Sequence, residues 1–166
     1  MPVTLDPMNA LALQPWFEAS EAEYVADLLR AGRTPEQARA KARSFEEDFP
    51  GGAPAPGHHV FDVLHDGEPV GFVWIGPQTT GRSDEWWLWD VAIDERHRGR
   101  GFGRAAVELA EAEARRHGAR SLGLKVFGFN AAARALYESL GFATVQLEMT
   151  KTLEQPGGWE AAGSRA

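Results

Sequence analysis

The chain has 166 residues, of which 43% are hydrophobic and 25% are charged, a composition typical of one globular domain with a sizeable core. Its formal net charge of −7 argues against nucleic acid as a partner, because phosphate attracts basic surfaces. The charge mildly favours a cationic substrate, although solubility explains it equally well. The absence of cysteine excludes thiol nucleophiles, disulfides and zinc bound by cysteine. No signal-peptide pattern and no apolar run of about 18 residues occurs, so we expect a cytoplasmic protein that does not bind membranes.

The N-terminal part predicts a short edge strand followed by helices. The strand is Val3–Leu5. Apolar residues then recur at helical spacing over Leu11–Ala19 and Glu21–Ala31, which predicts two helices. Ser20 lies between them and is a suitable N-cap for the second helix.

A further helix is predicted to begin at a capping signature. Thr34 is followed by Pro35 at the first helical position and by Gln37 at the spacing of a capping box. We expect this helix to run to about Phe49. The Pro, Gly and Ala residues of Pro50–Gly57 predict a loop rather than a domain boundary, because the residues before them are too few for a separate core.

Three strands are predicted next. Asp66 and Gly67 separate two β-rich runs, His59–Leu64 and Glu68–Ile75, which is a strong signal for a β-hairpin. After a loop, Trp86–Ile93 is apolar on both faces except at one aspartate, the pattern of a central strand.

The remaining elements complete an α+β fold. Ala105–His117 predicts an amphipathic helix, Ser121–Phe127 a strand and Gln146–Thr152 a last strand. We expect a mixed sheet with helices on both faces. Residues 1–153 are predicted to form one domain, and residues 154–166 a flexible C-terminal tail of small and polar residues.

A basic, glycine-rich stretch follows the central strand and precedes the amphipathic helix. Its residues are Arg98, Gly99, Arg100, Gly101, Phe102, Gly103 and Arg104. The first turn of a helix has unpaired N–H groups and the positive end of the helix dipole, which together bind phosphate. Glycines leave those amides accessible, and arginines add charge. The spacing matches neither the P-loop nor the G-x-G-x-x-G dinucleotide fingerprint.

Two motifs in this order resemble those of the GNAT superfamily, the acetyl-CoA-dependent N-acetyltransferases. Arg98-x-x-Gly101-x-Gly103 after a strand is similar to its pyrophosphate loop, although alone it also fits a glycine-rich turn with solvated arginines. Asn130 to Phe142 is similar to the second signature, N-x-x-A-x-x-L-Y-E-x-x-G-F. The resemblance implies a mostly antiparallel central sheet with a splayed strand pair, acetyl-CoA as co-substrate, no metal, and a homodimer as one option for the assembly.

The resemblance also implies roles for individual residues. Amides of the loop from Arg98 to Arg104 would hold the pyrophosphate, while for each arginine, and above all Arg104, plain solvated surface remains an alternative. Backbone N–H groups in the splayed strand would polarise the thioester; they belong to Val91, Ala92 and Ile93. Three residues of the second motif would bind coenzyme or act on it: Asn130 and Ala133 on the pantetheine side, and Tyr137 as the acid that protonates the departing thiolate.

The group that deprotonates the amine is left open. Some family members carry a glutamate five positions before the asparagine, where this chain has Lys125. The remaining candidates are Asp90, whose burial would raise its pKa, and Glu85, which shares strand parity with Val91. Asp90 could instead be a structural carboxylate and Glu85 an exposed surface residue. A water chain to solvent is a third route.

The acceptor is not readable from the sequence. Three tryptophans of the central strand could line a pocket or simply belong to the core: Trp86, Trp87 and Trp89. Three consecutive acids could attract an amine or be solvated: Glu46, Glu47 and Asp48. His58 and His59 should face opposite sides of a strand, which disfavours a metal site.

We expect direct acetyl transfer in a ternary complex to a primary amine of a small molecule or peptide. The alternatives are a non-catalytic acetyl-CoA sensor, another acyl group, or transfer to oxygen.

Overall fold

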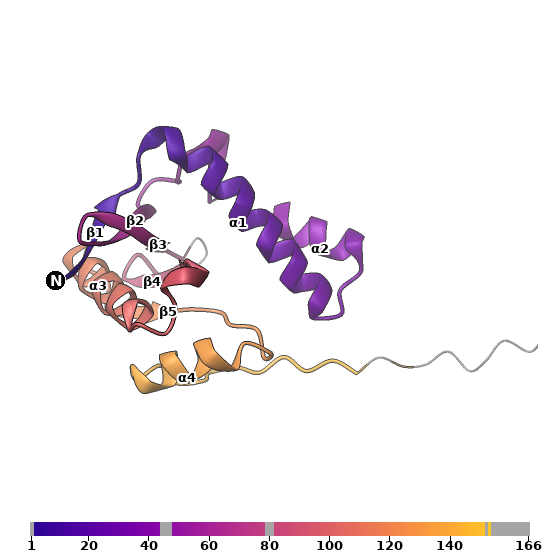
Figure 1. Ribbon diagram of the computed structural model, residues 1–166. Helices are drawn as coiled ribbons and strands as arrows, with labels where there is room; N and C mark the ends of the chain where they lie inside the picture. Colours follow the sequence, from indigo (N-terminus) through magenta and orange to yellow (C-terminus); the bar gives the residue numbers. More distant parts are fainter. Residues whose placement is uncertain (1, 44–47, 79–81, 152, 154–166) are drawn as a thin grey trace, which may run out of the picture.

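The computed structural model describes residues 2–43, 48–78, 82–151 and 153 (Figure 1). In chain order the elements are β1 (Val3–Pro7), α1 (Ala10–Arg30), α2 (Pro35–Ala42), β2 (His59–His65), β3 (Glu68–Pro77), β4 (Glu85–Ile93), α3 (Phe102–Arg116), β5 (Ser121–Gly123) and α4 (Ala131–Ser139), with 3-10 turns at Pro50–Gly52 and Glu95–His97. The strands form one sheet in the order β1-β2-β3-β4-β5, antiparallel except for the parallel pair of β4 and β5. The predicted mixed, mostly antiparallel sheet is confirmed.

Helices cover both faces of this sheet (Figure 1). On one face, α3 and α4 pack against a core of aliphatic and aromatic side chains in which Val73, Ile75 and Val107 are fully buried. On the other face, α1 packs through an aromatic cluster in which Phe17 of α1 and Phe49 contact Trp74 of β3. The two cores fix the sheet from both sides.

The β2–β3 turn has the predicted hairpin geometry. Asp66 has φ 55° and Gly67 has φ 82°, so both central residues adopt the positive φ of a type I′ turn. The capping box at the start of α2 is also present. The Thr34 side chain accepts a hydrogen bond from the Gln37 amide at 3.2 Å, and the Gln37 side chain accepts one from the Thr34 amide at 3.1 Å.

The predicted break at Ser20 is wrong, because α1 is one continuous helix over Ala10–Arg30. An N-cap serine turns its hydroxyl toward the amides of its own helix. Here the Ser20 hydroxyl instead donates a hydrogen bond across to the carboxylate of Asp90 in β4. Serine is tolerated within the helix because its polar group has this tertiary partner.

Other boundaries differ from the prediction as well, including the start of α3 at Phe102 rather than at Ala105. Helix α2 ends at Ala42, well before Phe49, and residues 44–47 lie outside the described part. Strand β5 ends at Gly123 rather than at Phe127, because β4 diverges from it at this point. The last predicted strand, Gln146–Thr152, does not form over residues 146–151, which pair with no described strand, and residue 152 lies outside the described part. The predicted tail, residues 154–166, lies outside it as well.

The parallel pair of β4 and β5 is closed at one end only. Pairing is limited to Glu85 with Ser121, Trp86 with Leu122, and Trp87 with Gly123. Beyond these pairs β4 and the segment that follows β5 are no longer paired, which confirms the predicted splayed strand pair.

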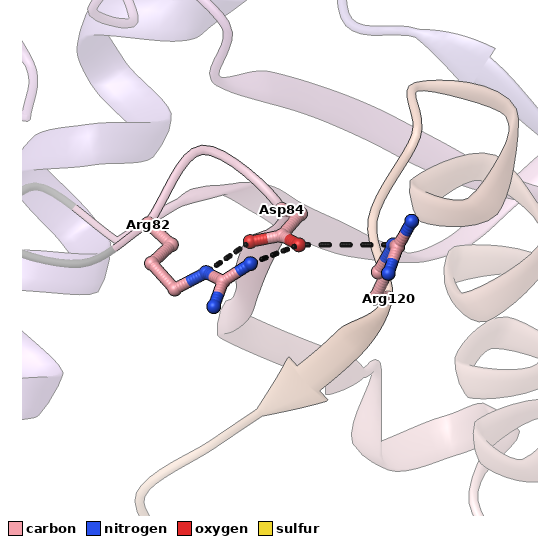
Figure 2. A network of polar contacts seen from close by, with 3 residues as sticks. All are labelled: Arg82, Asp84 and Arg120. Carbon is pink, nitrogen blue, oxygen red and sulfur yellow. Dashed lines mark hydrogen bonds and ion pairs between the residues drawn. The ribbon is translucent and has the colours of Figure 1, made fainter.

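Asp84 fastens the closed end (Figure 2). Its carboxylate pairs with Arg82 at 3.0 Å and with Arg120 at 3.8 Å, and its backbone carbonyl accepts a hydrogen bond from the Arg120 amide at 2.8 Å. The hydrogen bond from Arg82 holds the pKa of Asp84 below its usual value. Because both strands start from this point, they can diverge farther along without separating.

Candidate active site

Where the two strands diverge, backbone donors of β4 have no partner on β5. The Asp94 amide donates to the Val70 carbonyl of β3 at 2.9 Å. Successive amides of a strand point to opposite edges, so the Ala92 amide also faces β3, whereas the amides of Val91 and Ile93 face the gap. Of the three amides predicted to polarise a thioester, the geometry places two in the gap.

A bulge in β4 changes which residues share a face. The pairing register shifts between Trp74 and Ile75 of β3, so that Trp89 is the extra residue of β4. As a result Trp89 packs in the α1 cluster, whereas Val91 packs in the α3 core. The predicted shared parity of Glu85 and Val91 is therefore wrong. Glu85 lies in the closed, paired end of β4, away from the gap.

The three tryptophans of β4 do not form one wall. Trp86 is buried in the α3 core and stacks on His59 at a centroid distance of 6.0 Å. Trp89 stacks on Trp74 at 5.6 Å on the α1 side. The ring of Trp87 lies 6.0 Å from that of Trp89, and the ammonium of Lys125 lies 5.3 Å from the Trp87 ring centroid. Lys125 thus binds an aromatic face at the position where some family members have a glutamate.

Asp90 is the carboxylate beside the gap. It is partly buried under α1, and the loss of water around its carboxylate raises its pKa to about 6. Hydrogen bonds from the Ser20 hydroxyl and from the Val91 amide lower that pKa, while the charges of Glu23 and Asp27 on α1 raise it. Ser20 is a site residue that the sequence analysis missed. The signal was present, because residues 20, 23 and 27 are polar at helical spacing and share one face of α1.

Tyr137 faces the same region from α4. Burial raises its pKa above the usual value, and the charge of Asp90 raises it further, so these two groups of the predicted set lie within electrostatic reach of each other. Its ring packs edge-on against Phe142 with centroids 5.7 Å apart. Among the described residues no group hydrogen-bonds to the Tyr137 hydroxyl. Neither a helix end nor an arginine lowers the pKa of Tyr137.

The glycine-rich loop presents unpaired amides. Within the described part of the chain, the N–H groups of Gly99 through Arg104 have no protein acceptor; the first helical bond is from Ala105 to the Gly101 carbonyl at 3.2 Å. Gly101 is the N-cap of α3, with φ 83° and no side-chain cap, and Gly99 has φ 73°. These two positions require glycine for their backbone conformation.

Gly103 differs from Gly99 and Gly101, because neither its backbone conformation nor its neighbours require glycine. A Cβ atom there would lie 3.5 Å from Leu136 of α4 and 3.8 Å from Ile93. Both distances are ordinary van der Waals contacts, and both neighbours belong to the protein rather than to the open side of the loop. A Cβ atom would therefore fit at Gly103, and the backbone conformation of the loop depends on Gly99 and Gly101.

The three arginines of the loop make different contacts within the protein. Arg98 donates through Nε to the Ile93 carbonyl at 3.0 Å, which ties the loop to the end of β4. The guanidinium of Arg100 lies 4.9 Å from the Phe102 ring centroid. Arg104 donates to the Ser139 hydroxyl at 2.6 Å, so its side chain links α3 to α4.

The remaining predicted residues have local roles. The Asn130 side chain accepts a hydrogen bond from the Ala133 amide at 3.2 Å and caps α4.

Asp48 is buried, with Oδ1 3.9 Å from Nε2 of His58, and so belongs to the core rather than to a charged surface. Glu46 and Glu47 lie outside the described residues. His58 contacts Trp89 on the α1 side, and His59 contacts Trp86 on the opposite side, as expected for neighbours on a strand.

No group of three or more His, Cys, Asp or Glu residues in the described ranges is placed to hold a metal ion. The same residues contain no helix that is both long enough and apolar enough to cross a bilayer.

Comparison with known proteins agrees with this geometry. Residues 14–142 match the acetyltransferase (GNAT) family. The chain belongs to the GNAT acetyltransferase family. It is therefore an acyltransferase of a family that uses acetyl-CoA.

The relatives include proteins of similar length. YycN of Bacillus subtilis strain 168, an uncharacterized N-acetyltransferase, is 30% identical over 156 residues, covering 92% of this chain and 100% of that protein. The crystal structure of YycN has a TM-score of 0.83 to this GNAT chain at 29% identity, covering 92% of this chain and 99% of the other. The bS18 ribosomal protein alanine N-acetyltransferase of Escherichia coli K12 is 46% identical over 59 residues, which are 36% of this chain and 40% of that enzyme.

The raised pKa of Asp90 predicts a stability that falls with pH. A carboxyl whose pKa rises from 3.8 unfolded to about 6 folded favours folding when protonated, and this contribution is lost as pH rises through 6. Asp90→Asn should therefore be more stable than the wild type, by about 1 kcal/mol near pH 4.5 and about 3 kcal/mol near pH 7.5. Urea denaturation at both pH values measures this. Ser20→Ala should be less stable than the wild type, and the loss should be larger at the higher pH, because the Ser20 hydrogen bond lowers the pKa of Asp90. An effect of Asp90→Asn that does not depend on pH would contradict the raised pKa of Asp90.

Proposed function

We propose that this protein transfers the acetyl group of acetyl-CoA to a primary amine of a small molecule or peptide, directly within a ternary complex. One observation carries the proposal. Where β4 and β5 diverge, the amides of Val91 and Ile93 have no partner on β5, and at the end of β4 the amides from Gly99 to Arg104 have no protein acceptor among the described residues. A pantetheine arm with its pyrophosphate requires donors in this arrangement.

The loop amides would hold the pyrophosphate, with the helix dipole of α3 and the guanidinium of Arg100 adding positive potential. Acetyl-CoA supplies the activated thioester. The amides of Val91 and Ile93 would donate to the carbonyl oxygen, where negative charge develops, and one well-placed donor of this kind contributes about 3 kcal/mol. Val91 already donates to the Asp90 carboxylate, so the thioester oxygen would share or replace that hydrogen bond.

Asp90 is the base that the geometry favours. Its pKa of about 6 leaves it mostly ionised at neutral pH, yet makes it a stronger base than an ordinary aspartate. Ser20 holds the carboxylate in place from α1. Glu85 is disfavoured because it lies in the paired end of β4.

Tyr137 would protonate the departing thiolate. An ordinary phenol is a weaker acid than a thiol by about 2 kcal/mol, and burial of Tyr137 widens that difference, so the hydroxyl must be in direct contact with the sulfur. The charge of Asp90 is one cause of the raised Tyr137 pKa. When Asp90 accepts the proton of the amine its charge disappears, and Tyr137 becomes a better acid at the moment when the thiolate leaves.

The choice of nitrogen as acceptor is supported by the relatives. Both YycN and the bS18 alanine enzyme are named N-acetyltransferases, and the second acts on a protein. The acidic residues of α1 beside Asp90, Glu23 and Asp27, would favour a cationic amine.

The first prediction from this proposal concerns coenzyme binding. Gly101→Ala and Gly118→Ala each place a Cβ at a positive φ, 83° and 89°, with no atom within 4 Å, so both should cost about 1–2 kcal/mol of stability. Only Gly101 orients the loop amides, whereas Gly118 follows the other end of α3. Calorimetric titration with acetyl-CoA should therefore show at least tenfold weaker binding for Gly101→Ala alone. Equal affinities of the two variants would contradict the phosphate site.

The second prediction concerns turnover. Wild-type protein should release free coenzyme A from acetyl-CoA with at least one member of a panel of polyamines, aminoglycosides, amino acids and peptide N-termini. Tyr137→Phe should lower kcat on that amine by about 100-fold or more, because general acid catalysis is lost, while the affinity for acetyl-CoA is retained. If kcat is unchanged in Tyr137→Phe, the acid role is wrong.

A further inference from the structure

One basic side chain lies beside the divergence of β4 and β5 without an acidic partner. The ammonium of Lys125 lies over the ring of Trp87, 5.3 Å from its centroid, and no carboxylate among the described residues forms an ion pair with it. The chain has 24 acidic and 17 basic residues, so acidic partners are in excess. Several other basic residues do pair with a carboxylate: Arg82, Arg115, Arg116, Arg120 and Arg134. Lys125 is therefore available to bind an anion from outside the chain.

The contacts of Trp87 place Lys125 where the two strands part, on the face covered by α1. Trp87 forms the last pair with β5, opposite Gly123, and a Cβ atom at Gly123 would lie 3.3 Å from the indole ring. The ring also lies 6.0 Å from that of Trp89, which packs in the α1 cluster. The lysine therefore shares the α1 face with these two tryptophans.

Helix α1 contacts both sides of the divergence on this face. The Ser20 hydroxyl donates a hydrogen bond to Asp90 of β4. The ring of Tyr24, one turn later in the helix, lies 6.0 Å from that of Phe127 in the segment after β5. Asp90 and Lys125 thus belong to the same face of the sheet, with one on each side of the divergence.

The phosphates of the coenzyme would lie at the other end of β4. The loop amides from Gly99 to Arg104 follow Ile93, and Trp87 and Ile93 are about 20 Å apart along an extended strand. A phosphate bound by the loop is too distant to contact Lys125. The anion that Lys125 would meet therefore belongs to the acceptor.

We propose that the acceptor carries an anionic group as well as its amine, and that Lys125 selects it by binding the anion while the amine lies at Asp90. This inference rests on the proposed acetyl transfer and specifies its acceptor. The bonds made and broken are those of that transfer: the amine nitrogen bonds to the acetyl carbon and the carbon–sulfur bond breaks. Asp90 takes a proton from the amine, and Tyr137 gives one to the thiolate.

The spacing of the two groups limits the length of the acceptor. From Trp87 to Asp90 an extended strand rises about 10 Å. An extended peptide of about three residues has its N-terminal amine and its C-terminal carboxylate at that separation. In an α-amino acid the two charges are one carbon apart and cannot reach both groups. The acceptor class is therefore a short peptide, or an ω-amino acid of the same length.

The first test uses acceptors that differ only in the charge at one end. Free coenzyme A released from acetyl-CoA is measured with Gly-Gly-Gly and its C-terminal amide, and with 8-aminooctanoate and its amide. For at least one pair kcat/KM should be at least tenfold higher for the acid, and the better pair distinguishes a peptide from an ω-amino acid. Equal values for acid and amide in both pairs would overturn the inference. Turnover of other amines without turnover of either acid would overturn it too, yet would leave the proposed acetyl transfer in place.

The second test assigns the preference to Lys125. Lys125→Gln should remove the difference between acid and amide by raising KM for the acid alone, whereas Lys125→Arg should keep it because the charge is retained. Lys125→Glu should reverse it. The matched control Lys151→Gln removes the same charge from the segment after α4 and should keep the wild-type preference. Each ratio compares two acceptors on one variant, so a loss of folded protein does not alter it. A preference for the acid that survives in Lys125→Gln would refute the role of Lys125.

Discussion

The divergence of β4 from β5 is the constraint on which the rest of the site depends. Three residue pairs and the Asp84 clamp hold the strands together at one end, and beyond Trp87 and Gly123 no backbone hydrogen bond joins them. Buried backbone donors are normally satisfied within a sheet. Amides without a strand partner beside a helix N-terminus would suit an extended ligand that carries its own acceptors, as the proposed function requires.

The electrostatic arrangement follows from the same gap. Asp90 lies beside the gap because the β4 bulge keeps it on the α1 side, where Ser20 can hold it. Its partial burial raises its pKa, and its charge raises the pKa of Tyr137 in turn. In the proposed reaction, protonation of Asp90 would lower the pKa of Tyr137, so the removal of one proton would favour the supply of another.

The sequence predicted the parts of the molecule that local chemistry determines. The Asp66–Gly67 turn, the Thr34 capping box and the glycine loop before α3 each have a signal within a few residues, and each forms as expected. Tertiary contacts decided the rest. Ser20 does not end a helix because Asp90, far away in sequence, satisfies its hydroxyl. The bulge at Trp89 breaks the parity on which the interpretation of Glu85 depended, and no residue near it marks the bulge in advance. The predicted strand at residues 146–152 does not form over residues 146–151, because an alternating pattern alone does not supply a strand partner.

The most direct measurement is amide hydrogen exchange by NMR, with and without saturating acetyl-CoA. The account predicts slower exchange at Val91 and Ile93 and at the amides from Gly99 to Arg104, with no change at the paired residues Glu85–Trp87. Unchanged exchange in the gap and the loop, or protection confined to other parts of the protein, would contradict it.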